Sequence, residues 1–225
     1  LRGIALNGLK KFQISESEIG LLYIQNNFVR PLETGEYAFW TVNRDVALRT
    51  LSRIVPNPDF PLEDVLIEQH PEFVSAYCEV VQLQDRQVAI VRYLGKVIAI
   101  LPPTNRKLFW RGVEVEMIDI SSNAKLSPNL VAELLAGSKE VLLLSHNSLH
   151  VREVLAQHVG LLYVNQEFQA LLQPGIHAWW LYGRSFQTEV IDMRLQNIEV
   201  SGQDILSKDK VPLRLNLTAG FRIQD

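Results

Sequence analysis

Short apolar runs separated by polar turns recur three times along the chain and predict a protein built mainly from strands. The runs Ile19–Ile24, Val88–Leu94 and Val159–Val164 each lead into a short polar turn. A second apolar run follows each turn and carries, at corresponding places, Phe28, Ile98 and Phe168. Two short apolar runs around a tight polar turn are typical of a β-hairpin, so each stretch is expected to open with one.

A second turn lies after each hairpin. Gly35 and Gly175 align there with Asn105. Glycine and asparagine tolerate a positive φ best, so we expect one backbone shape at the three positions. Each turn is followed by an aromatic pair: Phe39-Trp40, Phe109-Trp110 and Trp179-Trp180. Neighbours in a strand point to opposite faces, so we expect one ring in the core of its repeat and the other where repeats meet.

A fixed interval relates the three stretches. Trp40, Trp110 and Trp180 are spaced by 70 residues, and Tyr23, Tyr93 and Tyr163 keep the same interval. Such self-similarity indicates an internal triplication. We therefore predict that these six aromatic residues are structural anchors and that Gly35, Asn105 and Gly175 form the turns.

The triplication predicts an α+β fold dominated by strands. Three tandem β-rich repeats, each a hairpin plus following strands, are joined by short helices. The expected divisions are residues 1–70 with a trailing helix, 71–150 with trailing helices, and 151–225. Units of this size are small for independent folding, so neighbouring repeats are expected to bury surface against each other.

Two patterns define the later strands. The runs Val113–Ile120 and Phe186–Met193 align with an offset of 73, so the third copy has three more residues than the second near Leu181–Gly183. The last run, Val211–Ile223, alternates apolar and polar residues, which predicts one buried and one solvated face. Pro212 lies out of phase near its start, as is typical of an edge strand or an unpaired first residue.

Helices are expected between the repeats. Ser127 followed by Pro128 is an N-cap signal, and Gly137 can end that helix. A second helix is expected near Pro61, and a third over His150–Ala156.

Composition and charge exclude several classes of protein. The net charge of −3 comes without a long basic run, which argues against nucleic acid as a partner. Cys78 is the single cysteine, so no internal disulfide forms and a reducing compartment is indicated. No segment reaches the roughly 18 apolar residues of a membrane span. The chain starts at Leu1 and stops at Asp225 after a strand-like run, so we expect a fragment of a longer protein.

Several motifs follow one another in the last third of the chain. They are Pro174-Gly175-Ile176-His177, Asp192-Met193-Arg194-Leu195-Gln196, Ile205-Leu206-Ser207-Lys208-Asp209 and the alternating run Val211–Ile223. In this order they resemble the opening of the SPFH domain, or band 7, of stomatins, slipins and prohibitins. The resemblance covers roughly residues 159–225 and is nearest to bacterial slipin-like proteins with extra copies of the opening β unit.

The resemblance implies a non-enzymatic scaffold without a cofactor. It implies a homo-oligomer in the intact protein, a membrane-protease partner of the NfeD type, and a cytoplasmic place, with a peripheral position at the inner membrane face as the alternative. The chain departs from the family in two respects: an apolar anchor before the domain is missing, and the chain ends before the family's helices and coiled coil.

Histidines are the first candidates for chemistry. His146 and His150 would share one face if both lay on a helix, with Glu153 or His158 as a further metal ligand. No recognised ligand pattern results, so we predict no metal site. Cys78 with His70 could form a thiol–imidazole pair, but a lone cysteine is more often a small buried hydrophobe.

Serines and carboxylates complete the candidates. Ser145 lacks the context of a nucleophile elbow, and Ser201-Gly202 is expected in a turn without a base. The acidic residues Glu114, Glu116 and Asp119 are expected to be mostly solvated. Asp192 and Arg194 would share a strand face, and an ion pair with neighbours is expected there rather than catalysis.

Three functions follow from these observations. The first is a scaffold that acts by self-association and partner docking. The second is a module that binds a peptide or a protease partner along an exposed strand edge, with the aromatic pairs as a further candidate binding surface. The third is an unrecognised hydrolase or metalloprotein built around the histidines. No catalytic, cofactor-binding or metal residue is predicted under the first.

Overall fold

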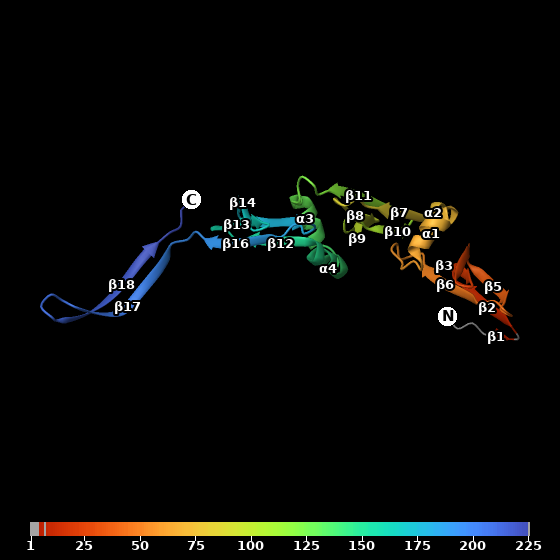
Figure 1. Ribbon diagram of the computed structural model, residues 1–225, viewed down its shortest axis with the longest axis horizontal. Helices are drawn as coiled ribbons and strands as arrows, with labels where there is room; N and C mark the ends of the chain where they lie inside the picture. Colours follow the sequence, from red (N-terminus) through yellow and green to blue (C-terminus); the bar gives the residue numbers. More distant parts are fainter. Residues whose placement is uncertain (1–4, 7, 225) are drawn as a thin grey trace. The chain divides into compact units, whose positions relative to one another are not determined.

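The computed structural model describes residues 5, 6 and 8–224, and strands dominate it (Figure 1). The fold is α+β and rich in small antiparallel sheets, as expected. Residues 1–123 with 137–145 form one compact unit, and residues 124–136 with 146–225 form a second. None of the described helices has the length and apolarity that a membrane span requires.

The first repeat consists of two small sheets. Its strands are β1 (Ala5–Leu6), β2 (Leu9–Ile14), β3 (Glu18–Ile24), β4 (Asn27–Leu32), β5 (Gly35–Trp40) and β6 (Val46–Ser52). One sheet has the order β1-β2-β5 and the other β4-β3-β6, all antiparallel. The hairpin expected from the sequence is β3–β4, whereas the strand that precedes it, β2, was not anticipated.

The same pairing scheme occurs in the two later stretches. The second repeat contains β7 (Cys78–Gln82), β8 (Gln87–Tyr93), β9 (Lys96–Leu101), β10 (Arg106–Trp110) and β11 (Val113–Asp119). The third contains β12 (Leu149–Val154), β13 (His158–Val164), β14 (Glu167–Leu172), β15 (Gly175–Trp180) and β16 (Phe186–Asp192). In each, the first strand pairs with the fourth, and the second lies between the third and the fifth.

Helices occupy the connections between repeats. They are α1 (Glu63–Gln69), α2 (Pro71–Tyr77), α3 (Pro128–Leu135) and α4 (Lys139–Ser148). The Ser127 side chain accepts a hydrogen bond from the Leu130 amide at the start of α3, as its N-cap signal predicts. The helix expected over His150–Ala156 is wrong, because Leu149–Val154 pairs with β15 as a strand. Tertiary pairing has overridden a weak local preference there.

Each repeat has its own core between its two sheets. Phe39 packs against a cluster that contains Phe12 and Leu22 in the first repeat. Phe109 lies in the cluster of the second repeat and Trp179 in that of the third. One ring of each aromatic pair therefore lies inside its repeat, and strand geometry directs its neighbour to the opposite face.

The constant tyrosine interval does not correspond to equivalent strand positions in the second repeat. A β-bulge follows Leu22, Val91 and Leu162, so the equivalent of Tyr23 and Tyr163 is Arg92. Tyr93 pairs with Lys96 and holds the place of Ile24 and Val164. The expected equivalence of Tyr93 is therefore wrong by one residue, because constant spacing in sequence does not fix strand register.

The turn after the hairpin is one residue longer in the second repeat, which restores the constant spacing of the tryptophans. Two residues separate Leu32 from Gly35 and Leu172 from Gly175, but three separate Leu101 from Asn105. Gly35 and Gly175 have φ values of 150° and 140°, whereas in the second copy the residue with positive φ is Thr104, at 60°. The prediction that Asn105 shares their backbone shape is wrong, because the longer turn shifts the left-handed position by one residue.

A length difference also follows the aromatic pairs. Residues 41–45 link β5 to β6, and residues 181–185 link β15 to β16. In the second repeat, residues 111–112 link β10 to β11. The three extra residues noted near Leu181–Gly183 are thus shared by the first repeat, and the second repeat is the short one.

Candidate functional site

The face between the first two repeats is a core of its own. Helices α1 and α2 contribute Leu66 and Phe73, which pack with Tyr23 and Phe28 of the first repeat and Trp110 of the second. The Phe28 and Phe73 ring centroids are 5.2 Å apart. The connection after β6 therefore joins two repeats into one hydrophobic cluster.

Trp110 is held by that connection. Its indole Nε1 donates to the Ser52 carbonyl at 2.8 Å, and its backbone amide donates to the Pro56 carbonyl at 3.0 Å. The Phe60 ring lies edge-on to the indole, with centroids 4.7 Å apart. Trp110 is 8% exposed as a result.

The connection after β11 pairs with the chain at Trp180 through its backbone. The Trp180 amide donates to the Ala124 carbonyl at 2.8 Å, and the Leu126 amide donates to the Ala178 carbonyl at 2.9 Å. Residues 124–126 thus extend the sheet past β15, and Trp180 is 1% exposed. In the second and third repeats, the chain that leaves the preceding repeat gives the tryptophan amide a carbonyl acceptor.

Trp40 differs from its two counterparts. It is 67% exposed, so the prediction that Trp40 is a buried anchor is wrong. The segments that contact Trp110 and pair beside Trp180, residues 52–56 and 124–126, have no counterpart before β2 among the described residues. The periodic pattern correctly predicted the position of the indole at the end of its strand. It could not predict whether another segment packs over the ring.

The strands β17 (Gln196–Leu206) and β18 (Pro212–Phe221) form a two-stranded hairpin. A β-bulge at Ser201 and Gly202 changes the register, and Gly202 has a φ of 68°. Such a bulge adds one residue, so the apolar positions before and after it stay on one face. The prediction of a turn at Ser201-Gly202 is replaced by this bulge within a strand.

One face of the hairpin is apolar and solvated. Its cross-strand pairs are Ile198 with Ala219, Val200 with Leu217, Gln203 with Leu215 and Ile205 with Leu213. Every residue of β18 is exposed. The prediction that the run Val211–Ile223 has a buried face is therefore wrong: the amphipathic pattern is present, but no described element packs on it.

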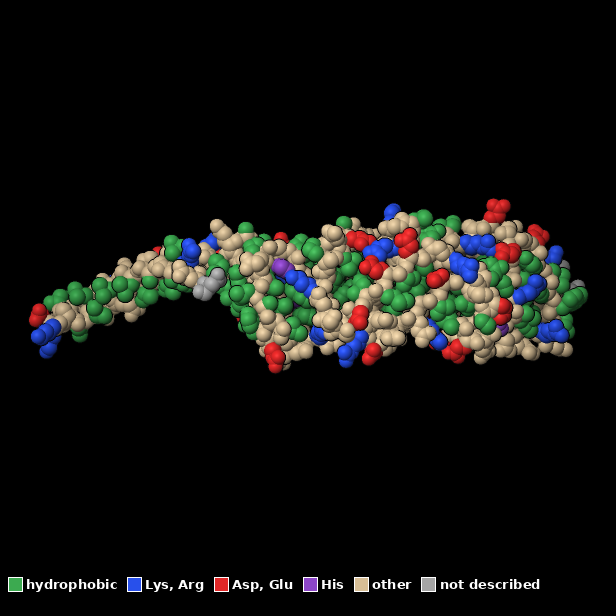
Figure 2. Space-filling model, turned by 90° about the horizontal axis from the view of Figure 1, so that it is seen from above, with side chains coloured by type: hydrophobic (Ala, Val, Ile, Leu, Met, Phe, Trp, Pro, Cys, Tyr) green, Lys and Arg blue, Asp and Glu red, His purple; other side chains and the backbone are tan. Residues whose placement is uncertain are grey.

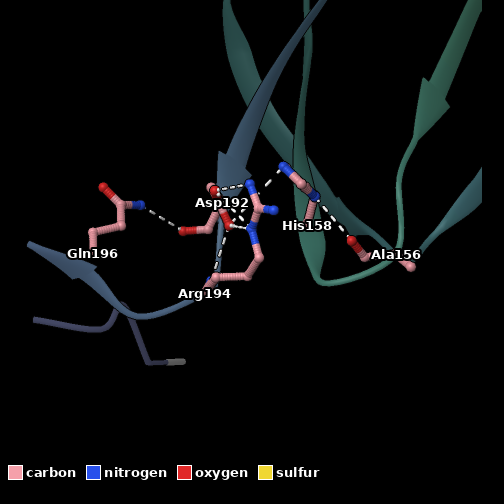
Figure 3. Close-up of polar contacts among 5 residues, drawn as sticks. All are labelled: Ala156, His158, Asp192, Arg194 and Gln196. Atoms are coloured by element: carbon pink, nitrogen blue, oxygen red, sulfur yellow. Dashed lines mark hydrogen bonds and ion pairs between the residues drawn. The ribbon is translucent and has the colours of Figure 1, made fainter.

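A polar cluster surrounds Asp192 at the end of β16 (Figure 3). Arg194 donates from Nε and Nη2 to the Asp192 carboxylate, at 2.6–3.0 Å, and the Arg194 amide adds a bond of 2.9 Å. These bonds hold the pKa of Asp192 well below its usual range. Gln196 donates to the Asp192 carbonyl at 3.0 Å, and His158 Nε2 lies 4.0 Å from the carboxylate. Asp192, the last residue of β16, and Arg194 form an ion pair with each other, which fixes the exit of the chain from β16.

The candidate metal ligands lie on different elements. His146 lies on α4, His150 and Glu153 on β12, and His158 on β13. His150 Nε2 is 3.1 Å from Thr188 Oγ1, and its ring stacks on Phe186 with centroids 5.9 Å apart. Burial lowers the pKa of His150. No group of three or more potential metal-binding side chains occurs in the described part of the chain.

Cys78 lies in the core between the first two repeats. Burial raises the pKa of its thiol to about 12, so the thiol is protonated at neutral pH and is a poor nucleophile. The His70 ring instead packs edge-on to Phe28, with centroids 4.8 Å apart, and His70 Nδ1 lies 3.6 Å from Glu72. The structure supports the reading of Cys78 as a buried hydrophobe.

The remaining candidates show no catalytic arrangement. Ser145 is buried on α4, and its Oγ makes no hydrogen bond to a described residue. Glu116 pairs with Arg92 at 2.7 Å. Asp119 accepts a hydrogen bond from the Ser121 amide, and hydrogen bonds from Ser121 lower its pKa. Glu114 is exposed on β11.

Comparison with known proteins locates a family domain in the last third. Residues 152–225 match the SPFH domain / Band 7 family. This part of the chain is similar to the SPFH, or band 7, superfamily. The match starts within β12 and takes in the third repeat and the β17–β18 hairpin. No curated protein and no solved structure matches the chain.

The band 7 segment contains each motif on which the resemblance was based. Gly175 begins β15, and Ile176 and His177 follow within that strand. His177 Nε2 lies 2.8 Å from the Gln173 carbonyl across the turn. Asp192 and Arg194 shape the passage from the third repeat into the hairpin. Sequence reasoning missed the connections that contact Trp110 and pair beside Trp180, although their position directly before each repeat was a usable signal.

Proposed function

We propose that this chain is part of a non-catalytic scaffold of the SPFH type, with bacterial slipins as the subtype, that acts by self-association and partner docking. The proposal rests on the match of residues 152–225 to the band 7 family, which is of a non-enzymatic, scaffold type. Members of that family typically oligomerise. The three repeats, divided at residues 70 and 150, would serve as packing units.

The geometry supports assembly over catalysis. The aromatic residues of the repeats fill cores or lie on faces between repeats, and the buried thiol of Cys78 is protonated. The apolar face of the β17–β18 hairpin and the exposed Trp40 offer surface for association.

Light scattering after size-exclusion chromatography of the intact protein tests this function. A homo-oligomer several times the mass of the protomer is expected. A monomer at every concentration would contradict self-association. An enzyme built on the histidines predicts instead that purified protein holds about one equivalent of zinc, lost in the double variant His146→Ala, His150→Ala.

A second candidate is a module that binds a peptide or a membrane protease partner of the NfeD type. It is favoured by the β17–β18 hairpin, a two-stranded sheet whose strands have free edges among the described residues. An extended peptide can add to such an edge through backbone hydrogen bonds. This candidate predicts a monomer that binds its partner one to one.

A further inference from the structure

The His150 side chain joins the two sheets of the third repeat. His150 lies on β12, where it pairs with Trp179 of β15. Its Nε2 lies 3.1 Å from Thr188 Oγ1 on β16, a strand of the other sheet. Its ring stacks on Phe186 of β16 and also contacts Trp179, with ring centroids 5.9 Å apart in both pairs. One imidazole therefore makes a polar and an aromatic contact between the sheets.

The same place in the first two repeats holds side chains of a different kind. Lys10 on β2 and Glu79 on β7 each pair with the first ring of the aromatic pair, as His150 does. Lys10 Nζ donates to the Val46 carbonyl on β6 at 2.9 Å, whereas Glu79 is exposed. Lysine and glutamate as a rule keep their charge between about pH 5 and pH 8, and histidine does not. At this position, the third repeat therefore has a group whose charge changes near neutral pH.

Burial and a nearby cation disfavour a positive charge on His150. Burial lowers the pKa of the partly buried ring, and the Arg152 guanidinium adds to the effect. Four of the five histidines are partly buried in this way, and Figure 2 shows histidine surface at only a few small places on the visible face. A protonated imidazole would lose hydration between the sheets without gaining an opposite charge.

No carboxylate faces the ring from the described strands that pack against it. Glu153 of β12 and Glu189 of β16 point to the opposite faces of their strands. Asp192 is on the same side of β16 as Thr188, but about 13 Å farther along the strand. Glu167 of β14 is exposed and two strands away from β16. The other titratable groups on this side are cations or histidines: Arg152 of β12, Lys125 beside Trp179, His177 of β15 and His158 of β13.

We propose that His150 makes the third repeat sensitive to acid: protonation of its imidazole weakens the contact between β12 and β16, whereas the first two repeats keep their packing. Because burial lowers the pKa of His150 from 6.5 in the folded state, the unfolded chain binds the proton more readily. The stabilisation is therefore fully present above pH 6.5 and is lost as the pH falls below it. The inference goes beyond the proposed function and does not depend on it.

Hydrogen exchange read by mass spectrometry tests this on the wild-type chain at low protein concentration. Exchange is compared at about pH 8 and about pH 5, after correction for its intrinsic pH dependence. Protection factors of β12, β15 and β16 are expected to fall by about threefold or more at the lower pH. Those of β2, β5 and β6 should change by less than about twofold. Equal losses in the two repeats, or no loss in the third, overturn the proposal.

A pair of glutamine variants assigns the effect to one ring. His150→Gln removes the titrating group and keeps a side chain that can hydrogen-bond to Thr188, so its protection factors in the third repeat should be equal at both pH values. His177→Gln is the matched control, because it makes the same change on the same face of the β12–β15 sheet, where Nε2 lies 2.8 Å from the Gln173 carbonyl. It should keep the wild-type loss. A His150→Gln protein that still loses protection at low pH overturns the proposal.

NMR titration of the wild type gives a measurement that needs no variant. The Cε1 proton of His150 is identified by its contacts with the rings of Trp179 and Phe186. Its signal should titrate below pH 6.5. Titration at or above that pH overturns the proposal and leaves the scaffold function unaffected, because the device lies within one copy.

Discussion

Neighbouring aromatic residues in this protein have opposite environments because strand geometry separates them. Phe109 belongs to the core of the second repeat, and Trp110 belongs to the core between the first two repeats. In the first repeat the same alternation leaves Phe39 half-buried and Trp40 exposed. The energetic role of an indole at this position therefore depends on the segment that precedes its repeat.

Replacing Trp110 or Trp40 with alanine is expected to lower the free energy of unfolding by different amounts. Trp110→Ala removes a buried ring and leaves a cavity, which lowers the free energy of unfolding by about 3–5 kcal/mol. Trp40→Ala changes it by no more than about 0.5 kcal/mol, because the ring is solvated. Urea denaturation at low protein concentration, where copies do not associate, measures both. Equal losses in the two variants would contradict the burial difference.

Cys78 gives a prediction on pH dependence. Burial raises the pKa of its thiol from 9.0 to about 12, so the folded state favours the protonated form. The resulting stabilisation is fully present below pH 9.0 and is lost as pH rises toward 12. The stability of wild-type protein should therefore fall more steeply above pH 9.0 than that of Cys78→Ala protein. Parallel curves would show that the thiol is not desolvated.

At the scale of elements, one bulge decides the character of the last hairpin. Ile198 and Val200 lie at even positions and Ile205 at an odd one, so a regular strand would place them on opposite faces. The extra residue at Ser201-Gly202 brings them to one face, across from Leu213 and Leu217. The Gly202 amide donates to Asn216 Oδ1 at 2.9 Å, which helps hold the bulge.

Gly202 should therefore discriminate between substituents by backbone conformation. Its φ of 68° suits glycine and asparagine and is costly for a β-branched residue. Gly202→Val is expected to weaken hydrogen-exchange protection of the β17–β18 amides by about 1–2 kcal/mol, and Gly202→Asn by less. Gly220→Ala in β18, where φ is not positive, is the control and should have a small effect. Equal effects of valine and asparagine would exclude the bulge geometry.

At the scale of the molecule, connections are as much a part of the core as the repeats. The cluster around Trp110 takes Tyr23 and Phe28 from the first repeat, Phe73 from α2, and Cys78 from the second. No single repeat contains enough of this surface to bury it alone. Cohesion between the first two repeats therefore depends on the helices between them.

A double-mutant cycle on Phe28 and Phe73 tests this cohesion. The two rings are in contact, so Phe28→Ala and Phe73→Ala should be non-additive, with a coupling energy of about 0.5–1.5 kcal/mol. The matched pair Phe28→Ala and Phe109→Ala removes rings from two different clusters and should be additive. Additivity in the first cycle would mean that α2 contributes no specific packing to the junction.

The sequence by itself determined the elements and their recurrence, because hydrophobic alternation and turn residues are local signals. It placed the β3–β4 hairpin and its two counterparts, the N-cap at Ser127, and one ring of each aromatic pair at the core of its repeat. It also identified the band 7 segment from ordered motifs that the comparison then matched at residues 152–225.

Tertiary structure alone decided the strand register and which apolar side chains are covered. A one-residue shift made Arg92 rather than Tyr93 the counterpart of Tyr23, since pairing, and not spacing, sets register. Trp110 and Trp180 are buried, whereas Trp40 is solvated among the described residues, and the amphipathic β18 has no described element on its apolar face. Burial of a side chain depends on segments distant in sequence. A periodic pattern carries no information about which of these segments will pack against it.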